Sequence, residues 1–246
     1  MWNTIILEPM INALLFIYGL LGQNFGWAIV LFTALVRLIT LPLTMQQMRS
    51  TMVMQEIQKS SRYKKMQEKY KKDKQKLSEE QMKLFKDVGY NPMSGCLGLL
   101  VQFPIIIGLY QAVIRTLAAT PAQLFDLSKL LYPLTPTGLI PVNSQFLWMN
   151  LGQPERLVLD FLPFAIPVLT ILVVITTYLQ TKLTTPASTD SQGQAMTQMM
   201  GLYMPLLLGY FAYSLASGLA LYFFVSNLLG IVQGFIMRRI RERPAS

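Results

Sequence analysis

The sequence predicts an all-α integral membrane protein: a five-transmembrane-helix bundle with a cytoplasmic helical hairpin and an N-terminal interfacial helix. The chain is 52% hydrophobic and only 13% charged, with a mean hydropathy of +0.40, which is too apolar for an ordinary soluble domain of this size. Apolar stretches also recur at about 17 to 20 residues, the length that an α-helix needs to cross the hydrocarbon layer. Finally, the basic residues are gathered in segments that lie on one side of these stretches.

The N-terminal residues 1–25 are predicted to form an external amphipathic helix at the membrane interface. Their apolar run is interrupted by Glu8, Pro9 and Asn12, which favours an interfacial helix. A sixth span over the same run stays open, because residues 1–4 carry no basic side chain and charge counting does not separate the two alternatives.

The later elements follow the remaining apolar stretches in order. They are a first span at 26–45, a basic cytoplasmic hairpin at 46–96, a second span at 97–115, an external loop at 116–160, a third span at 161–180, a cytoplasmic loop at 181–198, a fourth span at 199–215, a fifth span at 219–237 and a basic cytoplasmic tail at 238–246. Because only residues 216–218 separate the last two spans, we expect a tight antiparallel helical hairpin there.

The distribution of lysine and arginine predicts the orientation. The segment 46–96 contains twelve of the 21 basic residues, whereas residues 1–25 contain none. The positive-inside rule therefore places the basic segment in the cytoplasm and the N-terminus outside. Alternation of the five spans then places the C-terminus in the cytoplasm and leaves three basic residues outside, which are Arg115, Lys129 and Arg156.

The basic segment is predicted to fold as two helical arms. The charge-dense stretch 71–74 is the predicted tip, a capping-box pattern of Ser78 and Gln81 would start the second arm, and Gly89 followed by Asn91-Pro92 would end it. Two alternatives stay open: a docking surface for acidic lipid, ribosome or chaperone, and a solvated basic coil that only fixes topology. The rough apolar face of the hairpin comprises Met45, Met48, Met52, Ile57 and Met66.

The residue inventory excludes most catalytic chemistry. The chain has one cysteine, Cys96, and no histidine. Disulfides, thiolate or imidazole metal cages, Ser-His-Asp triads and Cys-His dyads are therefore excluded together. We expect neither an enzyme nor a cofactor or metal site. The net charge of +9 is explained by topology, so no specific nucleic acid partner is expected.

Arg37 is a charge within the first predicted span. It lies eleven residues into the span, about 16 Å along a helix that rises about 1.5 Å per residue, and therefore near the middle of the membrane. Placing a cation there costs about 2.5–3.5 kcal/mol on insertion scales. All twelve acidic residues lie outside the predicted spans. We therefore expect Arg37 to lie in a water-filled cavity, hydrated and available to an anionic guest.

Polar side chains in the spans are of the kind that line such a cavity. Each one alone is typical of a helix–helix hydrogen bond, but their presence in four of the five spans favours a shared hydrophilic groove. The methionine-rich stretch 196–204 fits lipid-facing or core packing, and also a surface that accepts many guests. The polar residues are Thr33, Gln102, Thr176, Thr177, Gln180, Ser226, Asn227 and Gln233.

Three motifs resemble the YidC/Oxa family of membrane protein insertases. The family's first core helix, with its Arg, a Thr one turn earlier and Pro-Leu after it, resembles residues 25–50 (FGWAIVLFTALVRLITLPLTMQQMRS). Its next core helix, with Asn-Pro, Gly-Cys and Gln-x-Pro, resembles residues 91–110 (NPMSGCLGLLVQFPIIIGLY). Its last core helix, with Ser-Gly-Leu, Leu-Tyr and Ser-Asn, resembles residues 216–233 (ASGLALYFFVSNLLGIVQ). With the basic hairpin, the resemblance extends over about residues 1–240.

The resemblance implies a core of five helices around a hydrophilic groove. This groove would be open to the cytoplasm and to lipid and closed outside, and Arg37 in it would attract the acidic, polar tail of a client membrane protein. Thr33, Gln102 and Gln180 would help to hydrate it.

The resemblance also implies a contact surface for the client and a location. Tyr222 and Phe223 match the family's aromatic pair on the last helix, with Phe223 standing where some members have Tyr or Trp. The implied partners are nascent membrane protein clients and anionic lipids, with a Sec translocon and the ribosome as further candidates and no small-molecule substrate. The short basic tail weakens the case for ribosome docking through the C-terminus. The implied location is a bacterial plasma or inner membrane, as a multi-pass protein without a large periplasmic domain.

A small-solute or ion transporter or channel subunit is the alternative from another class. An intramembrane arginine with polar neighbours is also suited to bind an anionic solute. The predicted spans contain no carboxylate for ion coupling and the sequence has no inverted repeat, which favours the insertase.

Overall fold

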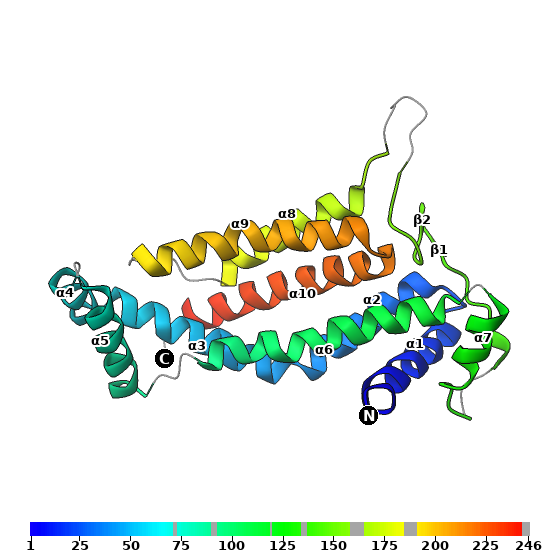
Figure 1. Cartoon of the computed structure of the whole chain (residues 1–246), viewed down its shortest axis with the longest axis horizontal. Helices are drawn as coiled ribbons and strands as arrows, with labels where there is room; N and C mark the ends of the chain where they lie inside the picture. Colours follow the sequence, from blue (N-terminus) through cyan, green and yellow to red (C-terminus); the bar gives the residue numbers. More distant parts are fainter. Residues whose placement is uncertain are drawn as a thin grey trace.

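A computed structural model shows a bundle of long helices (Figure 1). The described part of the chain is mostly helical, which confirms the predicted all-α class. The strands found in this part are β1 (Gln145–Phe146) and β2 (Met149–Asn150), which are short and pair antiparallel. The structure describes residues 1–70, 73–89, 93–118, 120–133, 137–157, 165–184 and 191–242.

Helix α10 is the central element of the bundle. It packs against α2, α6, α8 and α9, and α9 packs mainly on α8. The chain reverses between α9 and α10 over residues 215–216, so the predicted tight turn lies one residue earlier than expected. The long helices are α2 (Phe25–Ile39), α6 (Met93–Thr116), α8 (Val168–Thr184), α9 (Ser191–Ser214) and α10 (Ser217–Glu242).

The number of membrane spans stays a prediction. Among the described residues, Asn3–Leu20 and Ser217–Met237 are long and apolar enough to cross a membrane, and α2 with the helix that follows it would be a third if the bent pair is one span. Val101–Thr116 and Val168–Thr184 are shorter apolar helices. Helix α9 extends eight residues before the predicted fourth span, into the predicted cytoplasmic loop.

The first predicted span is interrupted by a break in the helix. Helix α2 ends at Ile39, and α3 (Leu41–Lys59) continues at 58° to it. Pro42 lies in the first turn of α3; it has no N–H to donate to the carbonyl of Leu38, and its ring would clash with that carbonyl in a continuous helix. The predicted span from 26 to 45 therefore contains a bend that the sequence analysis did not predict, and its cytoplasmic end stays a prediction.

The N-terminal helix lies against the bundle. A π-helical turn (Asn3–Leu7) leads into α1 (Glu8–Leu20), which packs against α2 and α6. In Figure 1, α1 is inclined to the long helices near the end of the bundle that carries α7 (Pro121–Ser128). Its buried face comprises Leu7, Ile11, Leu14, Leu15 and Tyr18.

The predicted helical hairpin is present as α4 (Ser61–Lys69) and α5 (Lys74–Asp87). It lies at the end of the molecule that we call the hairpin end (Figure 1). The Tyr63 hydroxyl accepts a hydrogen bond from Gln81 Nε2 at 3.0 Å. A small separate core holds the arms together, with Ile57, Tyr63, Leu84 and Phe85 buried and Met54 and Met66 packed against them.

Two details of the hairpin differ from the sequence prediction. The second arm begins at Lys74 and not at Ser78, because the Asp73 side chain caps the helix by accepting a hydrogen bond from the Lys76 N–H at 3.1 Å. The first arm is broken at Ser60, whose hydroxyl caps α4. Of the predicted apolar face, Met45, Met48 and Met52 lie in α3 outside the hairpin core, whereas Ile57 and Met66 belong to it.

The end of the second arm was predicted correctly. Helix α5 ends at Asp87, and Gly89 has a φ of +67°, a left-handed conformation that terminates helices and that glycine adopts without strain. Residues 71–72 of the predicted tip and Asn91-Pro92 lie outside the described residues.

The opposite end of the bundle, the loop end, is tied together by the chain after α6. The N–H groups of Ser217 and Gly218 at the start of α10 donate to the carbonyls of Gln153 (2.8 Å) and Leu151 (3.0 Å). Gly218 permits this approach, since a Cβ there would lie 3.1 Å from the Leu151 oxygen. The predicted external loop therefore packs on the start of α10.

A buried carboxylate fastens the same loop to α8. Glu155 is 2% exposed, and its two oxygens accept hydrogen bonds from Trp148 Nε1 (2.8 Å) and from the N–H of Leu169 in the first turn of α8 (2.7 Å). The loop also contacts α2: the Phe146 ring lies over Gly26 at the start of this helix, where no Cβ would fit. Helices α2, α8 and α10 are thus joined at the loop end.

Candidate functional site

Arg37 contacts the central helix directly. It lies in the last turn of α2, and its Nε donates a hydrogen bond to Ser226 Oγ on α10 at 2.9 Å. Its Nη2 donates to the hydroxyl and to the carbonyl oxygen of Ser226, both at 2.7 Å. Ser226 therefore supplies part of the hydrogen bonding to the Arg37 guanidinium that was expected to come from water.

Arg37 has no carboxylate partner in the described part of the chain. The ion pairs found there join Arg62 to Asp87, Lys76 to Asp73, Lys83 to Glu80 and Lys129 to Asp126. None of these pairs includes Arg37. The N–H groups of its Nη1 also have no acceptor among these residues, so the guanidinium keeps donors for a further ligand.

A hydrogen bond to a third helix lies beside the contact between Arg37 and Ser226. Tyr222 lies one turn before Ser226 on the same face of α10. The Tyr222 hydroxyl accepts a hydrogen bond from Gln102 Nε2 on α6 at 2.6 Å. We call Arg37, Gln102, Tyr222 and Ser226 the arginine cluster. It joins α2, α10 and α6, and Tyr222 and Ser226 are only 2% and 4% exposed.

A second polar contact joins α10 to α8. The amide of Asn227 donates to Thr177 Oγ1 at 2.7 Å and to Thr176 Oγ1 at 3.3 Å. All three residues are buried. These three residues were predicted to line a groove. In this structure they instead form hydrogen bonds between helices, which is the usual role of a single polar residue in a span.

The contact between α8 and α10 should contribute modestly to stability. We expect Asn227→Leu to lower the free energy of unfolding in detergent by about 1 kcal/mol, because interhelical hydrogen bonds in membrane proteins average below this value and the leucine refills the volume. Chemical unfolding followed by tryptophan fluorescence measures this change. A loss of several kcal/mol would show that Asn227 does more than join two helices.

The other predicted site residues occupy separate positions. Thr33 is fully buried and its hydroxyl donates to the carbonyl of Ile29 on its own helix at 2.6 Å. The amide of Gln180 packs on Gly230 of α10, where a Cβ would lie 2.5 Å from Nε2. Gln233 lies two helical turns beyond Ser226 on the same face of α10, and its buried Oε1 has no hydrogen-bond partner within the described residues.

Phe223 lies in the hydrophobic core of the bundle. It is 5% exposed, and its ring packs on that of Tyr222 with 5.7 Å between the centroids. The Tyr222 hydroxyl was not found from the polar pattern of the spans, because tyrosine counts as apolar in hydropathy. Only the family resemblance pointed to it.

The family of this chain follows from comparison with known proteins. The sequence profile of the family described as 60Kd inner membrane protein matches residues 16–244. The chain belongs to this family. The match contains all four residues of the arginine cluster, and it confirms the YidC/Oxa resemblance, because relatives of the chain carry YidC names.

Members of the family resemble the chain over most of its length. It is 32% identical over 244 residues to the membrane protein insertase YidC of Oceanobacillus iheyensis, which covers 97% of this chain and 84% of the relative. It is 33% identical over 247 residues to the membrane protein insertase MisCA of Bacillus subtilis, with 99% and 82% covered. The inner membrane protein ALBINO3 of Arabidopsis thaliana chloroplasts is 32% identical over 221 residues, with 88% and 47% covered.

A solved structure of the family has a similar fold. It is titled "Active YidC insertase crystal structure with the first transmembrane domain resolved", and it matches with a TM-score of 0.57 at 26% identity. The match covers 90% of this chain and 43% of the solved one, so the chain spans less than half of that protein. The chain is thus a membrane protein with the helical fold of this family.

Proposed function

We propose that this protein is a membrane protein insertase, which helps nascent membrane proteins into the bilayer and assists their folding without covalent chemistry. The observation that carries the proposal is Arg37, a cation in a membrane protein's helical bundle that no described carboxylate neutralises and that a serine holds. The names of the relatives support it, since MisCA and the YidC proteins are named membrane protein insertases.

We further propose the predicted topology of five spans, with the N-terminus outside, α1 at the outer interface and the C-terminus in the cytoplasm of a bacterial cell. The basic hairpin end then lies in the cytoplasm, as the positive-inside rule requires. At the loop end, Trp27 in the first turn of α2 and Trp148 between β1 and β2 are exposed, as is typical of aromatic side chains at a membrane interface. The inclination of α1 to the long helices favours an interfacial helix over a sixth span.

In the proposed mechanism, the acidic tail of a client replaces Ser226 as the ligand of Arg37. A guanidinium binds a carboxylate through two parallel, charge-assisted hydrogen bonds, which are about twice as strong as bonds to a neutral hydroxyl. Ser226 keeps the cation satisfied while no client is present, and it gives up only neutral hydrogen bonds when a carboxylate arrives.

The client would reach Arg37 by parting α6 from α10. The hydrogen bond between Gln102 and Tyr222 joins these helices next to Arg37, and Tyr222 and Phe223 are covered while it is intact. Breaking it would expose both rings to the emerging client helix. The proposed groove residues are Thr33, Arg37, Gln102, Gln180, Tyr222, Phe223, Ser226, Asn227 and Gln233.

The groove is proposed to open toward the cytoplasm and to stay closed outside. Gln180 and Gln233 lie beyond the arginine cluster toward the cytoplasmic ends of α8 and α10, and the unpartnered oxygen of Gln233 is suited to bind water. The loop end is tied by backbone hydrogen bonds, which supports closure on that side. The apolar burial of the client's own helix would drive insertion, so no nucleotide is needed.

The partners follow from the same proposal. Nascent membrane proteins are the clients, anionic lipids would contact the basic hairpin, and a Sec translocon and the ribosome are further proposed partners. The small core of the hairpin favours a defined docking surface over a solvated coil.

Insertion by the purified protein tests the proposal. The protein would be reconstituted in liposomes with a small client that carries an acidic tail, and insertion would be measured as protection of that tail from added protease. We expect protection well above that in empty liposomes. If insertion stays at the empty-liposome level while the protein admits small anions to the lumen, the transporter or channel alternative is correct.

A further inference from the structure

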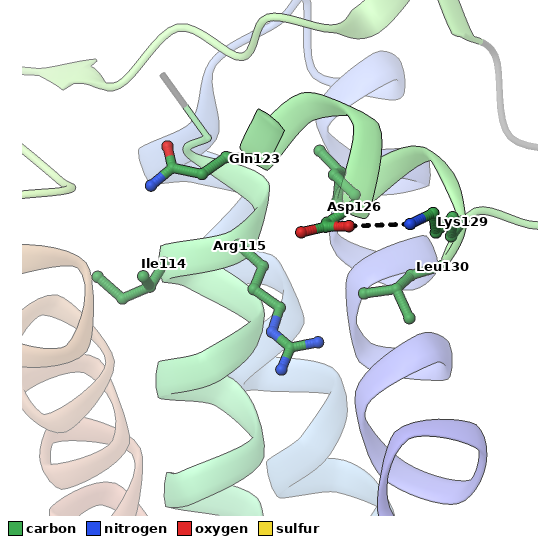
Figure 2. Close-up of a pocket in the computed structure, with 7 residues that line it drawn as sticks. Ile114, Arg115, Gln123, Asp126, Lys129 and Leu130 are labelled. Atoms are coloured by element: carbon green, nitrogen blue, oxygen red, sulfur yellow. Dashed lines mark hydrogen bonds and ion pairs between the residues drawn. The ribbon is translucent and has the colours of Figure 1, made fainter. Parts of the chain in front are cut away.

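A cavity of about 450 Å³ lies at the loop end, between the last turn of α6 and helix α7. This volume is within the range of small-molecule sites, roughly 300–1,000 Å³. Figure 2 shows the side chains of Arg115, Asp126 and Lys129 around the same space, with Arg115 coming from α6 and the other two from α7 and its end. Arg115 and Lys129 are two of the three basic residues that the topology places outside, so one cavity gathers most of the outer positive charge.

The charges in the cavity leave one cation available. Lys129 Nζ pairs with Asp126 at 3.1 Å and lies 4.2 Å from the centroid of the Phe125 ring. Arg115 forms neither an ion pair nor a hydrogen bond to its side chain among the described residues. The three charged residues therefore carry one net positive charge, centred on the Arg115 guanidinium.

The rest of the cavity wall is mainly apolar. Ile114, Leu127 and Leu130 line it together with Gln123, whose amide is the one uncharged polar group among the described lining residues, and Ile114 is 39% exposed at its edge. One turn before Arg115, the Gln111 side chain accepts a hydrogen bond from Trp2 Nε1 at 2.8 Å, which places an indole beside this part of α6. A cation above an apolar wall, next to an interfacial indole, is the arrangement that suits a lipid with a charged head group.

We propose that this cavity binds the phosphate diester of an anionic glycerophospholipid in the outer leaflet. The Arg115 guanidinium donates hydrogen bonds to the phosphate oxygens, and an acyl chain lies along Ile114 and Leu130. The apolar wall favours a lipid over a soluble phosphate, which would gain nothing from it. The site depends on the proposed topology and not on insertase activity, so binding is measured without any client.

Native mass spectrometry of the detergent-purified full chain with added phosphatidylglycerol tests the site. We expect Arg115→Gln to reduce bound phosphatidylglycerol about tenfold, since a charge-assisted hydrogen bond contributes this much to affinity. Asp126→Asn should have the opposite effect and increase binding, because it removes the negative charge from the cavity and releases Lys129. Opposite changes from two exposed residues of one cavity cannot come from loss of folding.

Arg156→Gln is the matched control, because it removes the third outer basic residue, which does not line the cavity. We expect it to bind as the wild type does.

Diacylglycerol, which has the acyl chains without the phosphate, should not be retained, and an excess of glycerol phosphate should not displace the lipid. The proposal is overturned if Arg115→Gln binds like the wild type, if Arg156→Gln loses as much, or if diacylglycerol binds equally. Displacement by glycerol phosphate would show a site for soluble anions instead.

Discussion

Arg37→Ala should lower the rate of insertion of a client with an acidic tail by about ten- to hundredfold. The variant removes a charge-assisted interaction with the client carboxylate, which contributes about 1.5–3 kcal/mol. Arg37→Lys keeps the charge but loses the two-point geometry of the guanidinium. Its insertion rate should therefore lie between those of the wild type and Arg37→Ala. The measurement is the initial rate of tail protection in proteoliposomes that contain equal amounts of each variant.

Two controls separate charge from packing. Ser226→Ala removes the hydroxyl that Arg37 contacts but keeps the cation, and it should insert within about threefold of the wild type. A client with asparagines in place of its acidic residues should show no difference between the wild type and Arg37→Ala. If Ser226→Ala loses as much activity as Arg37→Ala, or if the neutral client depends equally on Arg37, then Arg37 acts by joining α2 to α10 and the electrostatic mechanism is wrong.

Glu155→Ala should reduce the free energy of unfolding by about 2–4 kcal/mol. The buried carboxylate accepts hydrogen bonds from Trp148 and from the first turn of α8, and its removal leaves a buried backbone N–H and an indole N–H without their acceptor. Unfolding in detergent with circular dichroism measures the change. Glu155→Gln keeps one good acceptor and should lose about half as much.

The matched control for Glu155 is an exposed acid at the same end of the bundle. Asp126→Asn breaks only an ion pair between exposed side chains, so it should change the free energy of unfolding by about 1 kcal/mol or less. Equal losses in the two variants would contradict the role of Glu155 in holding the loop end together.

The sequence predicted the parts of the fold that depend on local pattern. Helical content, the basic hairpin and the end of its second arm at Gly89 all follow from hydropathy, charge position and turn chemistry. The break near Thr40 was missed because span length was given more weight than Pro42. The start of α5 was missed because two capping residues compete there, and Asp73 caps the helix in place of Ser78.

The pairings inside the bundle could not be predicted from pattern. Arg37 and Ser226 are 189 positions apart, and no periodicity indicates which polar residue of one helix meets which residue of another. Asn227 is the neighbour of Ser226 in sequence, yet it points to α8 while Ser226 points to α2. Successive residues of an α-helix are about 100° apart around its axis. This one step separates the contact of Ser226 with Arg37, the proposed binding group for the client, from the contact of Asn227 that only joins helices.

If the groove is closed at the loop end as proposed, this closure determines where the membrane potential acts on a client. In the proposed groove, water carries the cytoplasmic potential inward as far as Arg37, so the membrane potential falls mainly across the tied loop end. The interior of the cell is negative, so the free energy of a carboxylate falls by about 2.3 kcal/mol per 100 mV when it moves outward across this short layer. The same hydrogen bonds that hold α8 and α10 to the loop therefore concentrate the field on the last step of transfer, where an acidic tail leaves Arg37 for the outer surface.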